Sequence, residues 1–379
     1  MRITDVTCYP VWADRRNYVF LVVDTDEGLY GLGEAGLSRR ERAIAGVVEH
    51  FKPLLIGQDP SRTEHLWQVM SRGGFFPHDR VVGSAIAAID IALWDLKAKR
   101  FGVPLYELLG GLVRESVACY CHLGAPDIDG LVAAARERVA EGWKFIRWSL
   151  QGEGDVLEPT PAIRRAICEF EALRGALGDE VELCFDVHTR LSPPEAIRLC
   201  REIARYRPFF VEDPIRSESP QAFHALRGRI DVPLAAGEQF ASKWEFRELI
   251  DHDLIDYARV DLCIAGGLTE GKKIAGWCEG HYIDMAVHNP LGPVSTAACL
   301  HYNLAVPNFC VQEQPRRPGP GALAAEIVGG QPVWEDGSLL PPAGPGLGLT
   351  FDREAAAASP ARRGDHPRLR RQDGAFTNW

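Results

Sequence analysis

Three carboxylates stand at the ends of three successive apolar runs near the middle of the chain. Asp186 ends Val-Glu-Leu-Cys-Phe-Asp, Glu212 ends Pro-Phe-Phe-Val-Glu and Glu238 ends Pro-Leu-Ala-Ala-Gly-Glu, and consecutive carboxylates are 26 residues apart. That spacing holds one buried strand, one helix and two loops. Because repeated βα units place consecutive strand ends side by side, the three acids should meet at one rim. Three such oxygen ligands favour Mg²⁺, so the sequence predicts one Mg²⁺ ion per active site.

Two histidines near this rim could move protons. Asp261 and His288 end the sixth and seventh strand candidates, and as neighbours they can form a pair in which the carboxylate fixes the tautomer and raises the basicity of the imidazole. His188 follows Asp186 by two residues, so both side chains face the same way if the strand extends. The sequence therefore predicts a base at His288 and a second imidazole beside the metal.

The other strand ends and two loops supply further polar side chains. Glu313 ends the eighth strand candidate, Arg147 lies at the end of the second and His122 ends the first. The loops at 13–17 and 73–80 mix charged with aromatic residues, and each is either an ordinary solvated loop or part of a lid over the site. The candidate substrate-binding residues are Arg147, Ser149, His122, His78 and Arg16.

This set of side chains suits the removal of a weakly acidic proton. A divalent metal and a cation can hold a carboxylate while a base takes the proton from the neighbouring carbon, and the metal stabilises the enediolate that forms. An acid can then protonate a hydroxyl leaving from the next carbon. Proton abstraction followed by loss of water uses every residue named above, whereas hydrolysis with one metal would need fewer of them.

Strands followed by helices predict a separate α+β domain over residues 1–112. Strand patterns cover 3–11, 18–24 and 29–34, and helical patterns follow at about 40–54, 61–72 and 83–101. Because strands and helices do not alternate here, this region differs from a parallel α/β unit.

Steady alternation of strands and helices over residues 113–315 predicts an α/β fold, a (β/α)₈ TIM-type barrel. Eight strand candidates occur in about 200 residues, and each ends at a polar or ionisable residue, where such barrels place their chemistry. Two of the helices between them begin with predicted capping boxes, Ser192-Pro-Pro-Glu195 and Ser242-Lys-Trp-Glu245. A segment rich in proline and glycine, 316–379, follows the barrel.

Composition excludes several classes of partner. Lys plus Arg number 42 against 52 Asp plus Glu, a net charge of −10 without any basic run, which argues against nucleic acid or an anionic membrane. No window of about 18 apolar residues occurs and the N-terminus leads directly into a strand, so we expect neither a transmembrane helix nor a signal peptide. Ten scattered cysteines without a C-x-x-C pair are typical of a reduced, cytoplasmic protein.

The motifs in this chain resemble those of the enolase superfamily and its mandelate racemase subgroup. The resemblance covers the whole chain, Met1 to Trp379. Within that subgroup it most resembles acid-sugar dehydratases of the D-galactonate dehydratase type, which act in carbohydrate-acid catabolism. The motifs that carry the resemblance are Leu55-Ile-Gly-Gln-Asp-Pro-Ser61, the helix Ser84–Asp95, Asp186-Val-His188, Val211-Glu-Asp-Pro214, Ala236-Gly-Glu238, Asp261 with Ala265-Gly-Gly-Leu-Thr-Glu270, His288-Asn-Pro-Leu-Gly-Pro293 and Gln312-Glu-Gln314.

The resemblance implies a role for each residue and each domain. The N-terminal domain corresponds to a capping domain whose loops choose the substrate, and 316–379 would return to pack on it. A sugar acid would be the small-molecule partner, and the family is usually homo-oligomeric. The roles implied are Mg²⁺ ligands at Asp186, Glu212 and Glu238, a general base at His288 paired with Asp261, a general acid at His188, and a hydrogen bond to the enolic oxygen from Glu313.

Two positions depart from the relatives. Arg147 stands where many members of the subgroup have a lysine, and arginine binds anions but cannot act as a base. His122 stands where galactonate dehydratases tend to have an aromatic residue. Both positions lie where the substrate would, so the sequence leaves the sugar acid open, both its chain length and whether it is an aldonate or an aldarate.

Two alternatives to a dehydratase share the same scaffold. A racemase or epimerase needs a base on each face of the substrate carbon; Arg147 removes the usual second base, although His188 could replace it. A sugar-acid binding protein without turnover would have no use for an Asp–His pair. Formation of a 2-keto-3-deoxy acid that depends on Mg²⁺ would separate all three.

Overall fold

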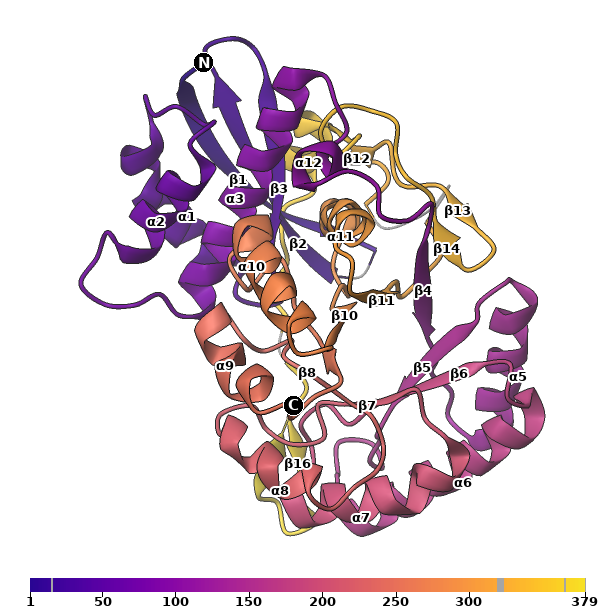
Figure 1. The fold of residues 1–379 in the computed structure, drawn as a ribbon. Helices are drawn as coiled ribbons and strands as arrows, with labels where there is room; N and C mark the ends of the chain where they lie inside the picture. The colour runs from indigo at the N-terminus through magenta and orange to yellow at the C-terminus, as the bar shows by residue number, and fades with distance from the viewer. Residues whose placement is uncertain (15, 319–323, 365, 379) are drawn as a thin grey trace.

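The computed structural model describes residues 1–14, 16–318, 324–364 and 366–378. Its N-terminal domain is an antiparallel sheet in the order β1–β2–β3, with helices packed on one face (Figure 1). Alternate residues of β2 point to opposite faces: Val19, Leu21 and Val23 pack against the helices, while Phe20 and Val22 join the core shared with the barrel. The elements are β1 (Ile3–Ala13), β2 (Arg16–Thr25), β3 (Tyr30–Ala35), α1 (Glu41–Leu55), α2 (Thr63–Arg72), α3 (Arg80–Phe101) and α4 (Leu105–Leu109).

Close contact between β3 and α3 depends on glycine. A Cβ atom added to Gly33 would lie 1.9 Å from the carbonyl oxygen of Ala88, and one added to Gly31 would lie 2.0 Å from that of Ala92. The strand therefore lies directly on the helix backbone, which fixes the sheet against the helix that later contacts the barrel.

Eight parallel strands close into a barrel, as predicted. Each strand pairs with the next along the chain, and β11 pairs with β4 to complete the ring. The strands are β4 (Val117–His122), β5 (Phe145–Ser149), β6 (Glu182–Asp186), β7 (Phe210–Glu212), β8 (Leu234–Ala236), β9 (Tyr257–Ala258), β10 (Asp284–Val287) and β11 (Phe309–Glu313). The helices are α5 (Ile128–Ala140), α6 (Pro159–Leu177), α7 (Pro193–Ile203), α8 (Phe223–Arg227), α9 (Lys243–Asp251), α10 (Gly267–Glu279) and α11 (Pro293–Ala305), with short 3₁₀ turns at Ala204–Tyr206 and Pro220–Ala222.

An apolar layer inside the barrel determines where the polar residues point. The layer consists of Tyr120, Cys184, Phe210, Ala235, Ala286 and Val311. Side chains two residues further along a strand face the same way. That step leads from five of the six positions to His122, Asp186, Glu212, His288 and Glu313, so the barrel core itself aims these residues into the mouth.

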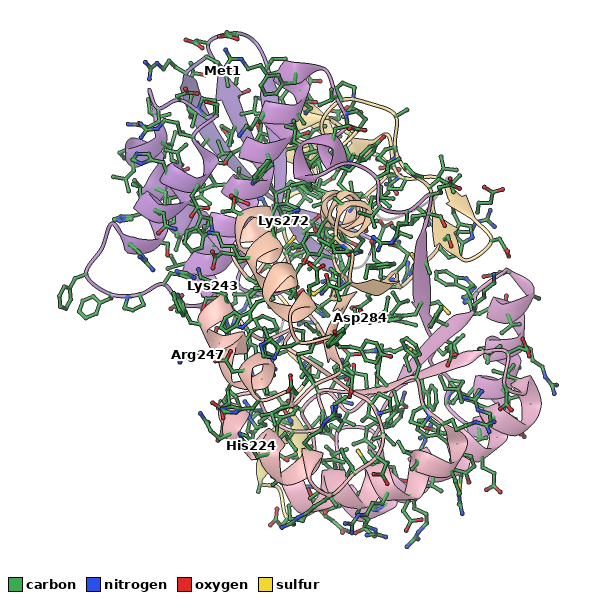
Figure 2. All side chains as sticks on the ribbon, in the orientation of Figure 1. Met1, His224, Lys243, Arg247, Lys272 and Asp284 are labelled. Carbon is green, nitrogen blue, oxygen red and sulfur yellow. The ribbon has the colours of Figure 1, made fainter. Side chains whose placement is uncertain are left out.

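One of the two predicted capping boxes forms. At α7 the Glu195 carboxylate accepts from the backbone N–H of Ser192 at 2.8 Å, as expected. At α9, which begins at Lys243 (Figure 2), the predicted box is absent. Glu245 instead accepts from the Ala241 N–H at 2.6 Å and pairs with Arg80 of the N-terminal domain at 2.8 Å, so a contact between domains replaces the local cap.

Two buried carboxylates fasten the N-terminal domain to the barrel. Glu34 of β3 accepts from the N–H groups of Gly292 (2.7 Å) and Ser295 (2.9 Å) at the start of α11. Asp90 of α3 accepts from the N–H (2.9 Å) and hydroxyl (2.5 Å) of Thr269 in α10. Burial raises the pKa of each carboxyl to about 7, although these hydrogen bonds oppose the rise.

The C-terminal segment first contacts the N-terminal domain and then continues to the barrel. The helix α12 (Arg353–Ala358) packs against β1, and Arg353 pairs with Asp24 at 2.6 Å. The chain then crosses to the barrel, where β16 and β17 form a hairpin beside the loops after β5, β6 and β7, a contact that the sequence analysis did not predict. The short strands are β12 (Val328–Gly329), β13 (Trp334–Glu335), β14 (Ser338–Leu339), β15 (Thr350–Phe351), β16 (Leu369–Arg370) and β17 (Phe376–Asn378). Within the described residues, no helix is both long and apolar enough to span a membrane.

Candidate active site

A cavity of about 740 Å³ lies over the barrel mouth, under the N-terminal domain. Arg16 from the N-terminal domain and His366 from the C-terminal segment contribute to its wall. The predicted site residues that line it are Arg16, His122, Arg147, His188, Glu238, Asp261, His288 and Glu313, while Asp186 and Glu212 lie fully buried beneath it.

Two of the predicted substrate-binding residues lie outside this lining. His78 bridges Ser71 Oγ (2.9 Å) and the Ala241 carbonyl (3.3 Å), and it faces a separate hollow. Its ring therefore fastens the loop at 73–80 to the barrel, and it does not line the cavity over the barrel mouth. Ser149 ends β5 beside Asp186 but does not reach the cavity wall formed by the described residues.

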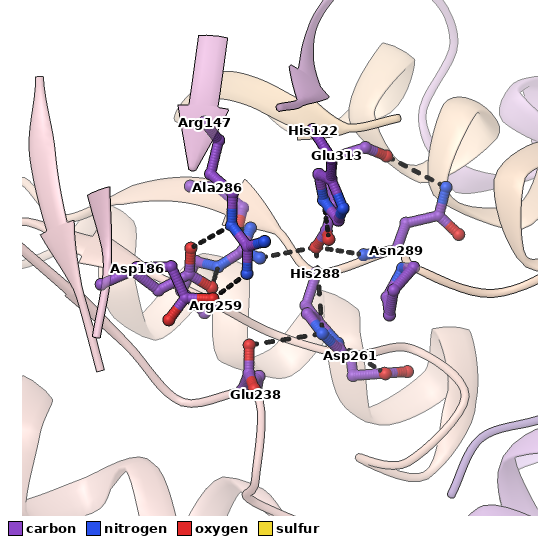
Figure 3. Close-up of polar contacts among 12 residues, drawn as sticks. His122, Arg147, Asp186, Glu238, Arg259, Asp261, Ala286, His288, Asn289 and Glu313 are labelled. Atoms are coloured by element: carbon purple, nitrogen blue, oxygen red, sulfur yellow. Dashed lines mark hydrogen bonds and ion pairs between the residues drawn. The ribbon is translucent and has the colours of Figure 1, made fainter. Parts of the chain in front are cut away.

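His288 is held as the sequence predicts. Its Nδ1 lies 2.8 Å from Asp261 Oδ2, and Asp261 Oδ1 accepts from the Cys263 N–H at 2.7 Å (Figure 3). This pairing leaves Nε2 facing the cavity, 3.3 Å from Glu238 Oε2. Burial opposes the charge on the imidazole, but the surrounding carboxylates, Glu238 first, raise the pKa of His288 to about 9. Asp261 therefore holds Nδ1, and Nε2 is the ring nitrogen that faces the cavity.

Glu313 has partners on both oxygens. Its Oε1 lies 2.7 Å from His122 Nε2, while Oε2 accepts from Arg259 at 2.6 Å and from the Asn289 N–H at 3.0 Å (Figure 3). Although burial raises it, the pKa of Glu313 is held well below its usual value by the charges of His288 and Arg259. Glu313 is therefore an ionised carboxylate that orients His122 and Arg259.

Arg259 is a central residue that the sequence reasoning missed. Its guanidinium is fully buried and donates to Glu212 Oε1 (2.7 Å), Glu313 Oε2 (2.6 Å) and the Ala286 carbonyl (2.8 Å). It lies two residues beyond Tyr257, which packs against the apolar layer of the barrel. The same two-residue step that locates the other site residues could have found it.

The carboxylates at the ends of β7 and β8 are gathered for a cation. Among the described residues, Glu212, Asp213 and Glu238 bring carboxylate oxygens within 4.8 Å of one another. Glu212 Oε2 and Asp213 Oδ2 are buried, and no described residue hydrogen-bonds them. Burial and the neighbouring Glu212 charge raise the pKa of Asp213 to about 8. Hard carboxylate oxygens that lack hydrogen-bond donors fit Mg²⁺. The sequence reasoning missed Asp213, although it directly follows a predicted ligand.

Asp186, the third predicted ligand, faces Arg147 and His188 in this structure. Asp186 Oδ2 forms an ion pair with the Arg147 guanidinium and lies 2.7 Å from His188 Nε2. The register nevertheless aligns Asp186 directly with Glu212. The three predicted ligands are thus neighbours, with the Arg147 cation beside them: its Nε is 4.0 Å from Glu212 Oε2.

His188 lies in a turn, because β6 ends at Asp186. The φ angles of His188 and Thr189 are +52° and +57°, in the left-handed region, and the His188 N–H donates to Asp186 Oδ1 at 2.6 Å. The imidazole still reaches Arg147 Nη2, at 3.1 Å. Burial, followed by the charges of Arg147 and Arg190, holds the pKa of His188 well below its usual value.

The two imidazoles face each other across the mouth. In the closed ring of eight strands, β6 and β10 are separated by three strands in either direction, so His188 and His288 project from opposite sides. The cavity that both of them line lies between them. A substrate there would have one imidazole on each side and carboxylates below.

Two family models match the chain. The N-terminal domain of the mandelate racemase / muconate lactonizing enzyme family matches residues 11–110, and the enolase C-terminal domain-like family matches residues 130–356, more than half of the chain. The chain belongs to the mandelate racemase / muconate lactonizing enzyme family. Both halves of this family are thus present, in the order that the sequence motifs predict.

Relatives of this family member are named as acid-sugar dehydratases. It is 38% identical over 392 residues to a D-mannonate dehydratase of Caulobacter sp. strain K31, with 96% of each chain covered. It is 36% identical over 390 residues to a D-galactonate dehydratase of Ralstonia pickettii strain 12J, with 100% of each chain covered. An enolase of Pantoea ananatis, solved with bound D-gluconate and Mg, superposes with a TM-score of 0.94 at 32% identity and 99% coverage of both chains.

Proposed function

We propose that the protein is a Mg²⁺-dependent acid-sugar dehydratase, an enzyme of the hydro-lyase class. It takes the proton next to the carboxylate of an aldonate or aldarate and eliminates the neighbouring hydroxyl, which yields a 2-keto-3-deoxy acid. The observation that carries the proposal is the placement of His288 and His188 on opposite sides of one cavity, above a group of buried carboxylates. The dehydratase names of the relatives support the same reaction class.

The carboxylates would hold Mg²⁺. Glu212 and Glu238 are the predicted ligands within the close group of carboxylates, and Asp186 adjoins them in register. When bound, the ion neutralises charge on the substrate carboxylate and on the enediolate that develops from it. Arg147, whose guanidinium stays charged throughout, adds a second positive group for the same carboxylate.

His288 removes the α-proton with its Nε2 atom, and Asp261 holds the ring in the tautomer that leaves Nε2 free to accept. In the predicted hydrogen bond between Glu313 and the enolic oxygen, the ionised carboxylate could only accept from the enol hydroxyl, and it would have to release one of its present partners. His122, which Glu313 orients and which lines the cavity, is placed to make that contact instead.

His188 delivers a proton to the leaving hydroxyl from the other side. The nearby Arg147 cation opposes protonation of the imidazole, and a substrate carboxylate lying against Arg147 offsets part of that opposition. A second candidate, an epimerase, is favoured by one observation: two imidazoles facing each other are also what abstraction on one face and return on the other requires. The product separates the two, since a dehydratase makes a keto acid and an epimerase does not.

A panel of aldonic and aldaric acids tests the proposal. We expect at least one acid to yield a 2-keto-3-deoxy product in the presence of Mg²⁺ and none in excess EDTA, read by a carbonyl reagent and by NMR. Conversion of a sugar acid to an epimer without keto acid would replace the dehydratase by the epimerase. The homo-oligomer stays a prediction, which light scattering of the purified chain tests.

A further inference from the structure

The C-terminal hairpin, residues 369–378, lies on the loops that follow β5, β6 and β7. In Figure 1, β16 lies among the barrel elements, far from the N-terminal domain that the preceding segment covers. The Arg370 N–H donates to the Asp155 carbonyl at 2.9 Å, and the Leu157 N–H donates to the Arg370 carbonyl at 2.9 Å. These backbone bonds add the hairpin to the loop after β5 as an extra strand-like layer.

Asn378 ties this hairpin to the next two loops. Its Nδ2 donates to the Thr189 carbonyl at 2.8 Å, and its Oδ1 accepts from Arg216 at 3.2 Å. Only 5% of the residue is exposed, so these bonds form away from solvent, where they are stronger and their loss costs more. Thr189 belongs to the loop after β6 and Arg216 to the loop after β7.

The Thr189 carbonyl belongs to a strained turn. His188 and Thr189 both have φ in the left-handed region, which L-residues seldom adopt. Such a turn persists only when its surroundings hold it. The Thr189 N–H donates to the Asp213 carbonyl at 2.8 Å, and Asn378 binds the carbonyl on the other side.

We propose that Asn378 is a positioning residue: it holds the His188–Thr189 turn so that the His188 imidazole faces the leaving hydroxyl. The proposal rests on the dehydratase function proposed above. Its consequence is selective, because the hairpin contacts the side of the mouth that carries His188, while His288 projects from the opposite side. A substitution of Asn378 should therefore slow the loss of water from the substrate and leave the rate of α-proton abstraction unchanged.

Asn378→Asp is the sharpest variant, because it keeps an oxygen for Arg216 and removes both N–H donors to Thr189. We expect kcat for dehydration to fall roughly 10- to 100-fold, the cost of a misplaced reacting group. The KM and the rate of α-proton exchange in D₂O should change by less than about twofold, because the variant should bind the substrate as the wild type does. Phe376→Ala, on the same hairpin with a side chain 72% exposed, is the matched control and should leave both rates unchanged.

A second readout needs no turnover. Amide hydrogen exchange of residues 186–191 should accelerate in Asn378→Asp and not in Phe376→Ala, and Asn378→Ala gives the same comparison if the Asp variant fails to fold. Equal loss of exchange and dehydration, or unchanged amide protection, would overturn the proposal. A wild-type protein that forms no keto acid would instead overturn the dehydratase function, and the amide comparison would still decide the role of Asn378.

A separate cluster on the outer surface has the composition of a transition-metal site. His224 of α8 lies at the periphery of the molecule (Figure 2), and its Nε2 is 2.9 Å from Glu248 Oε1 on α9. His252, one helical turn after Glu248, brings its Nε2 within 3.8 Å of the same oxygen. The three ligand atoms lie within 4.8 Å of one another.

The geometry points to a site for Zn²⁺ or Ni²⁺ at His224, Glu248 and His252. Ligands about 2.0–2.1 Å from a tetrahedral metal lie roughly 3.3 Å apart, and the distances of 2.9 and 3.8 Å fall on either side of that value. Two imidazoles and one carboxylate suit a transition metal and not Mg²⁺, which prefers oxygen ligands. Water or an external group would complete the coordination.

Calorimetric titration of the Mg²⁺-saturated protein with Zn²⁺ tests this site. We expect His224→Ala and His252→Ala each to remove one equivalent of bound Zn²⁺ or to weaken it at least tenfold. His281→Ala is the matched control, because His281 also pairs with an exposed carboxylate, Asp253 at 2.9 Å, but the described residues offer it no second imidazole. Identical Zn²⁺ titrations of the wild type and the His252→Ala variant would overturn the proposal.

Discussion

The two halves of the barrel mouth are built differently. In the half formed by β9, β10 and β11, each carboxylate oxygen of Asp261 and Glu313 has a protein partner. In the half formed by β6, β7 and β8, buried oxygens of Glu212 and Asp213 have no hydrogen-bond partner among the described residues. The first half satisfies its carboxylate oxygens with protein donors. The second half is incomplete, because beside the cations of Arg147 and Arg259 it keeps buried oxygens that a metal ion could bind.

Each half also has its own support. Glu34 and Asp90 of the N-terminal domain bind the first turns of α11 and α10, the helices that follow β10 and β9. The C-terminal hairpin holds the loops after β5, β6 and β7. Arg259 joins the halves, since its guanidinium pairs with Glu212 on one side and Glu313 on the other. His288, the proposed base, is thus held by protein contacts alone, whereas His188, the proposed acid, contacts the proposed metal ligand Asp186 and lies in the turn that the C-terminal hairpin binds.

Among the changes that test the difference between the two halves, removal of the metal should have the largest effect on activity. We expect chelation to lower keto-acid formation by at least about 10³-fold, the equivalent of several kcal/mol of charge stabilisation, and Mg²⁺ to restore it. Mg²⁺ should also raise the free energy of unfolding by about 2.7 kcal/mol at a hundred times its Kd, and Glu212→Gln should remove that gain. Full activity in excess chelator would contradict the assignment of the incomplete half to a metal.

Arg259→Met tests the junction between the halves. The substitution leaves the buried carboxylates of Glu212 and Glu313 without their shared counter-charge, so we expect a loss of about 3–5 kcal/mol in urea unfolding. Bound Mg²⁺ should reduce the destabilisation caused by Arg259→Met, because the ion offsets the charge on Glu212. Arg247→Met is the control: Arg247 pairs with Asp251 at the surface, at 3.3 Å, and its loss should cost less than about 1 kcal/mol. Similar losses for the two variants would mean that Arg259 does not bridge buried charges.

The fold and most of the candidate site could be predicted because both follow from local patterns. A buried strand needs a short apolar run, and its alternation places the residue at its end in the barrel mouth, which locates His122, Asp186, Glu212, His288 and Glu313. Contacts between residues that are far apart in the chain produce no such local pattern in the sequence. Glu245 was expected to cap its own helix, yet its partner Arg80 lies 165 residues earlier in the chain.

The same limit explains the other misses. His78 has the residue type of a substrate ligand, but its fold partners, Ser71 and Ala241, decide its role. The hairpin that ends in Asn378 reaches Thr189 across 189 residues, and neither short strand has an apolar pattern of its own. Glu238 and Asp261 were predicted as site residues at strand ends, and only the strand bounds differ: the two residues lie two and three positions beyond the observed β8 and β9.

The pH dependence of the free energy of unfolding should reveal how much Asp90, which joins the N-terminal domain to α10, contributes to stability. Because the pKa of the folded state, about 7, exceeds the unfolded value of about 4, the stability that Asp90 contributes is fully present below about pH 4 and is lost as the pH rises through 7. Asp90→Asn should remove this dependence, so the wild type should weaken against the variant by up to roughly 1.4 kcal/mol for each pH unit between 5 and 7. Urea unfolding at pH 5, 6, 7 and 8 measures the difference. Equal pH slopes for both proteins would show that Asp90 is ionised throughout.

The most direct test of the central claim, a base on one side of the mouth and an acid on the other, follows two rates in D₂O. For an acid that the wild type converts to a keto acid, α-proton exchange and keto-acid formation are measured in His288→Asn and His188→Asn, with His281→Asn as a surface control. The account predicts that His288→Asn loses both rates. It predicts that His188→Asn loses keto-acid formation by roughly 10²–10⁴-fold but keeps exchange, with the proton returned to the same face because Arg147 cannot deliver one to the other. Exchange at the wild-type rate in His288→Asn, or normal dehydration in His188→Asn, would contradict it.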